Sequence, residues 1–180
     1  MRLDNHNKIM VIGNNGSGKS YLSKQLAAIT GLPLVHLDVE YWLPDLTKRP
    51  EDDWRQMHEK LIAQEKWIID GNYMQADALI SRWAAADLVI FLDVNRFVCL
   101  FSAVKRNFHS RPDDGPQDFQ ETWDRRFFDM CVMIWRFTRD RKDIYLAPRE
   151  KYPNTAFLVI KGRKNMHRLL RAWKEECGIE

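Results

Sequence analysis

The hydrophobic positions of the chain fall into short apolar runs that alternate with longer amphipathic stretches. Five runs are apolar and mostly rich in β-branched residues, which predicts buried strands. They cover residues 9–12, 34–37, 67–69, 88–92 and 156–160. In six other stretches apolar residues recur at helical spacing. They cover residues 19–30, 51–66, 76–86, 97–108, 119–142 and 166–177. This alternation of strands and helices predicts an α/β protein with a parallel sheet.

Composition and charge are those of an ordinary globular domain. Of the 180 residues, 45% are hydrophobic and 29% are charged, so we expect a single domain over residues 1–180. The net charge of +3 is too small for a polybasic coat. Three widely spaced cysteines favour reduced thiols over a disulfide scaffold or a zinc site. The polar N-terminus and the absence of a long apolar run predict a cytoplasmic protein without a membrane segment, of unknown oligomeric state.

One motif with a specific chemical meaning lies between the first predicted strand and the first predicted helix. Residues 13–20 match the P-loop pattern G-x-x-x-x-G-K-[ST] in full. Glycines allow backbone N–H groups to turn toward phosphate oxygens, and the following helix adds the positive end of its dipole. We therefore predict an ATP-binding loop in which Lys19 reaches the β- and γ-phosphates and Ser20 binds Mg²⁺. Its residues are Gly13, Asn14, Asn15, Gly16, Ser17, Gly18, Lys19 and Ser20.

Three predicted strands end in an aspartate. Asp70 follows the third strand, where a carboxylate can hold Mg²⁺ through water, although a cap or turn residue is the alternative. Asp38 follows the second strand, and we predict that it orients or deprotonates an acceptor hydroxyl. Asp93 follows the fourth strand and is best interpreted as a turn residue.

Five segments of the sequence, residues 8–21, 32–42, 66–73, 86–93 and 98–106, resemble a known bacterial family, and three short strings are the most specific. Residues 31–33 (Gly-Leu-Pro), 36–38 (His-Leu-Asp) and 67–73 (Trp-Ile-Ile-Asp-Gly-Asn-Tyr) are similar to the DNA topology modulation proteins. That family belongs to the adenylate-kinase-like and shikimate-kinase-like P-loop superfamily. The resemblance implies a three-layer α/β/α fold with a five-stranded parallel sheet of order 2-3-1-4-5. It also implies an acceptor-binding segment at about 38–66 and a helical lid at about 106–142.

The chain departs from related nucleotide kinases after the third strand. In those kinases an Asp-Gly pair is followed by phenylalanine, proline and an arginine that holds the acceptor phosphate. Here residues 72–74 are Asn-Tyr-Met, so Arg49 or Arg82 would have to take the place of that arginine.

Seven arginines lie between residues 106 and 141, within the predicted lid. Phosphoryl transfer needs cations around the transferring group, and we assign this role to Arg106, Arg111 and Arg125. The alternative is that these arginines are solvated helix charges paired with neighbouring carboxylates. The aromatic side chains of this stretch are expected to pack in the core, with base stacking as the alternative. After the fifth strand, Arg163 lies where the superfamily holds adenine.

Two functional hypotheses follow. The first is a Mg²⁺-ATP-dependent kinase that transfers phosphate to a small molecule, such as a nucleotide or a nucleoside. The second, suggested by the family label, is an ATP-binding regulator that interacts with DNA and modulates its topology. The second hypothesis predicts salt-dependent DNA binding, and the nearly balanced charge does not favour it.

Overall fold

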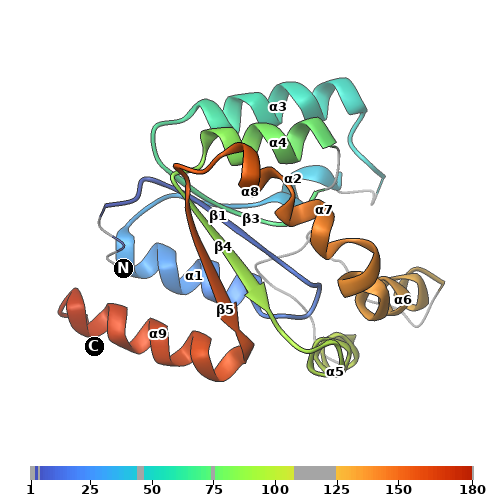
Figure 1. Cartoon of the computed structure of the whole chain (residues 1–180). Coiled ribbons are helices and arrows are strands. Elements are labelled where there is room, and N and C mark those ends of the chain that lie inside the picture. The colour runs from blue at the N-terminus through green and yellow to red at the C-terminus, as the bar shows by residue number, and fades with distance from the viewer. Residues whose placement is uncertain (1–2, 4, 44–46, 74–75, 108–124, 180) are drawn as a thin grey trace.

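The computed structural model describes residues 3, 5–43, 47–73, 76–107 and 125–179. Within these residues the chain forms three layers, with a sheet between two groups of helices (Figure 1). The strands are all parallel, and their order is β2-β3-β1-β4-β5. The predicted fold class and the predicted strand order are therefore confirmed.

The strands are β1 (Lys8–Gly13), β2 (Leu34–His36), β3 (Trp67–Asp70), β4 (Leu88–Asp93) and β5 (Ala156–Lys161). The helices are α1 (Lys19–Thr30), α2 (Leu37–Tyr41), α3 (Glu51–Ala63), α4 (Ala76–Ala85), α5 (Arg96–Asn107), α6 (Arg125–Asp140), α7 (Lys142–Leu146), α8 (Pro148–Lys151) and α9 (Gly162–Glu176).

Strand β1 shows why helices cover both faces of the sheet. Successive residues of a strand point to opposite faces, and the apolar residues of β1 are fully buried. Ile9 and Val11 pack into a core with residues of α1 and α9. Met10 and Ile12 pack into a second core with Trp54 of α3 and residues of α4. Figure 1 shows the same arrangement, with α1 and α9 on one face and α3 and α4 on the other.

The register of the strands brings the predicted site residues to one edge of the sheet. Gly13, which ends β1 and begins the P-loop, pairs with Leu92 near the end of β4. Asp70, which ends β3, pairs with Val11 of β1 and with His36, which ends β2. In a parallel sheet the carboxyl ends of the strands meet at one edge, where ligands of α/β proteins bind.

The second strand and the last helix differ from the prediction in where they end or begin. The second strand ends at His36, and the fully buried Leu37 begins the short helix α2 instead of extending the strand. Helix α9 begins at Gly162, before the predicted start at Met166. The prediction missed the first turn because this turn is polar and the prediction followed only the apolar positions.

The predicted helix over residues 119–142 is divided in the structure. Residues 119–124 lie outside the described residues, and α6 ends at Asp140. Two short helices, α7 and α8, follow it and were not predicted. They are too short to show a helical period, and Pro148 begins α8 because proline suits the first turn of a helix.

The three cysteines all lie within the described residues and form no disulfide there; Cys99 is buried, whereas Cys177 is exposed. Among the described residues no helix is both long enough and apolar enough to span a membrane.

Candidate functional site

The P-loop follows the backbone course that its sequence predicts. It leaves β1 at Gly13 and enters α1 at Lys19. Gly16 and Gly18 have φ angles of 75° and 106°, in the left-handed region that favours glycine. A Cβ atom at Gly16 would clash with the carbonyl oxygen of Cys99 in α5. The close approach of α5 therefore requires glycine at this position, in addition to the φ angle.

Asn72, in the loop after β3, holds the beginning of the P-loop. Its side-chain oxygen accepts a hydrogen bond from the Gly13 N–H at 3.2 Å, and its amide nitrogen donates to the Gly13 carbonyl oxygen at 2.7 Å. One amide side chain thus satisfies both polar groups of one residue. In the sequence, Asn72 marks only a departure from related kinases, because its role depends on a contact across 59 residues.

Arg163, at the start of α9, holds the middle of the P-loop. Its guanidinium donates to the carbonyl oxygens of Gly16 at 2.6 Å and Ser17 at 3.2 Å. It also donates to the hydroxyl of Ser102 in α5 at 2.6 Å. Arg163 was predicted to contact adenine. The structure places it against the loop itself, where its bonds direct the carbonyl groups of the loop toward α9.

The loop also contacts helix α6 of the predicted lid. The side-chain amide of Asn14 is buried and donates to the carbonyl oxygen of Ile134 at 3.0 Å. The amide of Asn15 lies 3.8 Å from the sulfur of Met133. The side chains of two predicted phosphate-binding residues therefore contact α6, which leaves their backbone N–H groups as the groups that could bind phosphate.

Lys19 lies among several charged groups. Its amine donates to the carbonyl oxygen of Asn14 at 3.1 Å. Burial lowers the pKa of Lys19, the nearby carboxylates of Asp70 and Asp38 oppose this shift, and Arg106 adds to it. Lys19, Asp70, Asp38 and Arg106 are thus close enough to interact electrostatically, as a phosphoryl-transfer site requires.

Asp70 is buried and has one oxygen available for a metal. Its Oδ2 atom lies 2.9 Å from Nδ1 of His36, and its side chain is 5% exposed. Its Oδ1 atom has no hydrogen-bond partner among the described residues. Carboxylate and hydroxyl oxygens are the ligands that Mg²⁺ prefers, so an unpaired Asp70 oxygen and the Ser20 hydroxyl at the start of α1 fit this ion. His36 was assigned no function from the sequence.

The predicted lid arginines differ in their positions. Arg106, near the end of α5, is partly buried and interacts with Lys19. Arg125 is exposed at the start of α6, nine residues and thus about 13 Å along the helix from Ile134, which contacts the P-loop. Arg111 lies outside the described residues. Of these three arginines, only Arg106 is shown near the loop.

Aromatic side chains of the lid divide between the core and the surface. Phe127 and Phe137 are buried, as the prediction of core packing requires. Phe128 and Trp135 are 58% and 43% exposed, so core packing does not describe them. Residues 119 and 123 lie outside the described residues.

Arg82 of α4, considered as an acceptor-binding residue, is fully buried. Its guanidinium donates to the carbonyl oxygens of four residues at 2.7 to 3.2 Å. These residues are Gly71, Asn72, Tyr73 and Ala78. Burial lowers its pKa to about 10, which leaves it charged at neutral pH. Arg82 thus supports the loop after β3 and has no exposed surface for a ligand.

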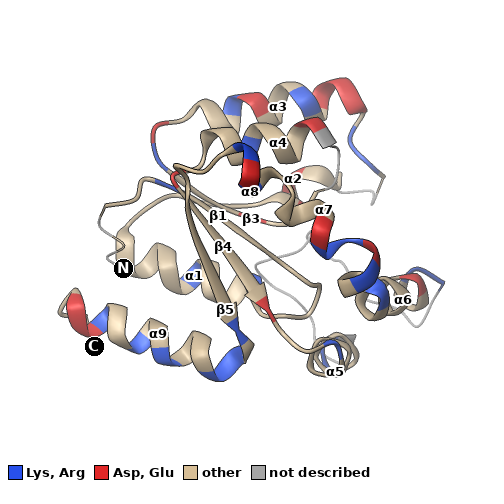
Figure 2. Cartoon of the chain, viewed as in Figure 1, with Lys and Arg blue, Asp and Glu red and all other residues tan. Residues whose placement is uncertain are grey.

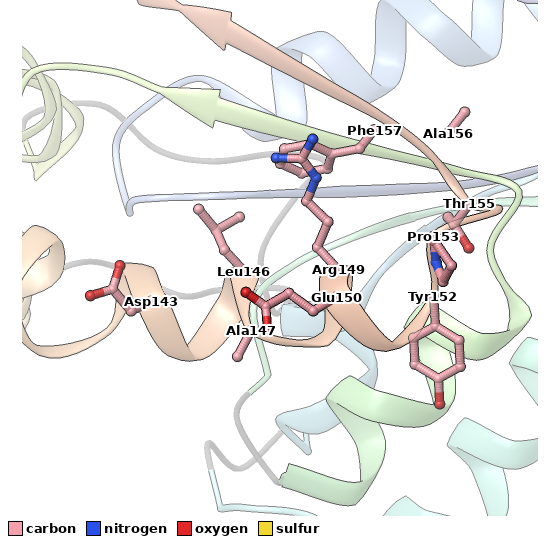
Figure 3. Close-up of a pocket in the computed structure, with 10 residues that line it drawn as sticks. All are labelled: Asp143, Leu146, Ala147, Arg149, Glu150, Tyr152, Pro153, Thr155, Ala156 and Phe157. Carbon is pink, nitrogen blue, oxygen red and sulfur yellow. The ribbon is translucent and has the colours of Figure 1, made fainter.

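Asp93 has a structural partner, and the groove beside α8 lies at the other end of the sheet from the P-loop. Asp93 accepts a hydrogen bond from Lys142 of α7 at 2.9 Å, in agreement with a structural role. A groove of about 890 Å³ lies between α7, α8 and the start of β5, and Figure 3 shows the residues that line it. Its β5 residues pair with β4 from Leu88 onward, at the opposite end from Leu92 and the P-loop. The lining residues are Asp143, Leu146, Ala147, Arg149, Glu150, Tyr152, Pro153, Thr155, Ala156 and Phe157.

Comparison with solved structures identifies the class of fold. A gluconokinase from Sinorhizobium meliloti 1021 matches with a TM-score of 0.55 and 14% identity, over 99% of this chain and 94% of that chain. A shikimate kinase from Bacteroides thetaiotaomicron matches with a TM-score of 0.54 and 15% identity, over 97% of this chain and 99% of that chain. A shikimate kinase from Acinetobacter baumannii, in complex with shikimate, matches with a TM-score of 0.54 and 13% identity, over 94% and 91% of the two chains. This chain therefore has the fold of the P-loop kinases.

Comparisons of the sequence are less informative. No family model matches the chain, and no curated protein matches it. The expected membership of the DNA topology modulation family is therefore not shown by these comparisons. At 13 to 15% identity the structural neighbours define the fold and leave the activity to be argued from the site.

Proposed function

We propose that the chain is a Mg²⁺-ATP-dependent phosphotransferase that phosphorylates a hydroxyl group of a small molecule. The observation that carries this proposal is the meeting of Lys19 with the carboxylates of Asp70 and Asp38 beside a complete P-loop. A phosphate-binding lysine, a carboxylate suited to Mg²⁺ and a second, exposed carboxylate are the groups that such a reaction requires. The P-loop kinase fold of the solved neighbours supports the same reaction class.

The proposed reaction assigns a role to each group of the site. The bond between the γ-phosphorus and the bridging oxygen of ADP breaks, and a bond to the acceptor oxygen forms. The hydroxyl proton of the acceptor passes to Asp38. Backbone amides of residues 14–20 and the Lys19 amine hold the phosphates, and Arg106 offsets the charge of the transferring group.

Mg²⁺ is the cofactor that the site suits. Ser20 and Asp70 would hold it, and the unpaired Oδ1 atom of Asp70 is the observation that favours this assignment. When bound, the ion supplies positive charge to the β- and γ-phosphate oxygens. His36 holds the other oxygen of Asp70 and so directs its carboxylate.

Two segments would complete the enzyme. Residues 38–66, which contain α2 and α3, are proposed to bind the acceptor. Residues 106–142, which include α6, are proposed to act as the lid, with Arg111 and Arg125 as further cations for the phosphoryl group. The contacts of Asn14 and Asn15 with α6 support a connection between the lid and the nucleotide. Cysteines without disulfides suit a reducing compartment, so we propose that the protein is cytoplasmic.

ADP release from Mg²⁺-ATP, measured across a panel of small alcohols, tests the proposal. One acceptor should stimulate ADP release, and Lys19→Ala should abolish both this stimulation and ATP binding. A protein that binds no ATP, or that binds ATP equally well after Lys19→Ala, would contradict the proposal. The DNA hypothesis gains no support from the structural neighbours. A gel-shift titration at two salt concentrations tests it separately.

A further inference from the structure

We infer that the acceptor is an alcohol without an anionic group, such as a nucleoside or a sugar, held by aromatic rings instead of an arginine. This inference rests on the proposed phosphotransferase function and concerns the acceptor side of the same site. It is drawn from the acceptor region, defined here as α2, α3 and residues 71–73 after β3. The charges and the rings of this region carry the argument.

Arg82 of α4, which holds the loop at residues 71–73, is unavailable to a ligand. Arg82 is 0% exposed, and its three guanidinium nitrogens all donate to backbone carbonyls. The loop at residues 71–73 therefore depends on Arg82 for its shape. An anion could reach this guanidinium only if the loop opened and lost those bonds.

Two further arginines lie near the rings. Arg55 of α3 pairs with Asp52, and Arg49, in the segment between α2 and α3, is held at the backbone of α2. The Nε atom of Arg49 donates to the carbonyl oxygen of Glu40, and its backbone N–H donates to that of Tyr41, both at 2.9 Å. These two bonds fix Arg49 beside the end of α2. Residues 44–46 and 74–75, which the structure does not describe, contain no lysine or arginine.

The acceptor-binding segment is acidic, in contrast to the whole chain. Residues 38–66 contain eight aspartates and glutamates against five lysines and arginines, whereas the net charge of the chain is +3. Asp38 is exposed, and three acidic residues occupy the first turn of α3, visible as red at one end of that helix in Figure 2. An anionic acceptor would be repelled by these carboxylates, and its desolvation would need a cation in compensation.

Aromatic rings of the acceptor region provide a surface on which an uncharged acceptor can bind. The ring centroids of Tyr41 and Tyr73 are 4.0 Å apart, and Trp54 lies 4.7 Å from Tyr73 and 5.2 Å from Tyr41. Trp42 extends the cluster at 5.4 Å from Tyr41. Trp54 is buried, whereas the other three rings are partly exposed. Partly exposed rings on a fixed base suit the apolar face of a nucleobase or a sugar.

The aromatic cluster adjoins the proposed base. Burial raises the pKa of Tyr73 far above its ordinary value, and the nearby carboxylate of Asp38 and hydroxyl of Tyr41 raise it further. The Tyr73 hydroxyl is therefore protonated and can donate a hydrogen bond to an acceptor oxygen. A ring-bearing alcohol that stacks on the cluster would have its hydroxyl group near Asp38.

Acceptors that differ only in an anionic group test this inference. ADP release from Mg²⁺-ATP would be compared for a nucleoside and its 5′-monophosphate, glucitol and gluconate, and shikimate methyl ester and shikimate. We expect the uncharged member of the active pair to have a kcat/KM at least tenfold higher. Tyr41→Leu should raise the KM for that acceptor about fivefold or more and leave the KM for ATP unchanged. Tyr21→Leu, which removes an exposed tyrosine of α1, is the matched control.

A higher kcat/KM for the anionic member would overturn the inference and leave the phosphotransferase proposal intact. Loss of that activity in Arg49→Met would then identify Arg49 as the anion-binding residue. If no pair stimulated ADP release although ATP bound in a Lys19-dependent manner, the phosphotransferase proposal itself would fail, and the inference with it. Loss of cooperative unfolding in Tyr41→Leu would make Tyr73→Phe the variant to measure, since it keeps the ring and removes only the hydroxyl group.

Discussion

Nδ1 of His36 lies 2.9 Å from Oδ2 of Asp70, and this contact leaves the other oxygen of Asp70 without a partner among the described residues. The two residues pair in register at the ends of β2 and β3, so the sheet itself sets their distance. A carboxylate held by one oxygen presents the other in a defined direction. The pair therefore links the architecture of the sheet to the proposed Mg²⁺ site.

His36→Ala is expected to weaken the use of Mg²⁺ more than the binding of nucleotide. Without His36 the Asp70 carboxylate can rotate, and partners of metal-binding groups typically contribute about tenfold or more to metal affinity. We expect a rise of about tenfold in the Mg²⁺ concentration that gives half-maximal ADP release. ATP affinity measured without Mg²⁺ should not change, and His36→Asn, which keeps a short polar side chain, should restore part of the effect.

His6→Ala is the control for this measurement. His6 faces Asp87 at 3.5 Å, where it lies at the opposite end of the sheet from the P-loop. The His6→Ala substitution removes a histidine beside a carboxylate without affecting the site. An equal change in Mg²⁺ dependence in both variants would contradict the proposed role of His36.

Gly16→Ala is expected to weaken the binding of ATP to the P-loop. The residue has a φ of 75°, and its new Cβ atom would meet the carbonyl oxygen of Cys99. The backbone of the P-loop or of α5 must move to make room for this atom. ATP affinity should therefore fall at least tenfold, which corresponds to about 1.4 kcal/mol or more. Isothermal titration with ATP measures this change.

Gly31→Ala separates the contact from the backbone conformation. Gly31 ends α1 with a φ of 70°, close to that of Gly16, but a Cβ atom there would meet nothing within 4 Å. It should lower stability by about 1 kcal/mol and leave ATP affinity unchanged. If Gly16→Ala bound ATP as well as Gly31→Ala does, the close contact with α5 would not matter for the loop.

Arg82→Met is expected to destabilise the fold by about 3 kcal/mol or more. The substitution keeps much of the side-chain volume but leaves the buried carbonyl oxygen of Gly71 and the partly buried carbonyl oxygens of Asn72 and Tyr73 without these donors. A buried group left unsatisfied costs about 1–3 kcal/mol. Urea denaturation measures the loss. Arg149→Met is the matched control, because Arg149 is exposed and lies on the ring of Phe157. Equal stability of the two variants would show that Arg82 is not required.

The sequence predicted those parts of the site whose determinants are local. The strand, the glycine pattern and the helix of the P-loop are contiguous, and Asp70 was recognised because an aspartate ended an apolar run. The residues that hold the loop in place could not be predicted in the same way. Arg163 contacts Ser17 from 146 residues away, and Asn14 contacts Ile134 from 120 residues away. Such contacts depend on the packing of α6 and α9 against the loop, and the sequence pattern contains no signal for their partners.

Arg82 illustrates a second reason. In the sequence it was one of two arginines that could bind an acceptor phosphate, because residue type alone does not distinguish a ligand-binding cation from a buried structural one. The distinction depends on where four carbonyl groups of the chain happen to point. The helical period of apolar positions in α4 did not predict that one of its arginines would be fully buried.

His58 is expected to make the stability of the protein depend on pH in the mildly acidic range. It is 2% exposed in α3, and burial, with a smaller contribution from the charge of Arg82, lowers its pKa from 6.5 to about 4. Between these two pH values the unfolded chain binds a proton at His58 and the folded chain does not. The free energy of unfolding therefore falls as the pH is lowered from about 6.5 to about 4, by up to about 3 kcal/mol from this residue. Urea denaturation of the wild type and of His58→Gln at pH 7 and pH 4.5 measures the effect. The variant should lose less stability than the wild type over this interval, and an equal loss in both proteins would show that His58 titrates in the folded state as it does in the unfolded chain.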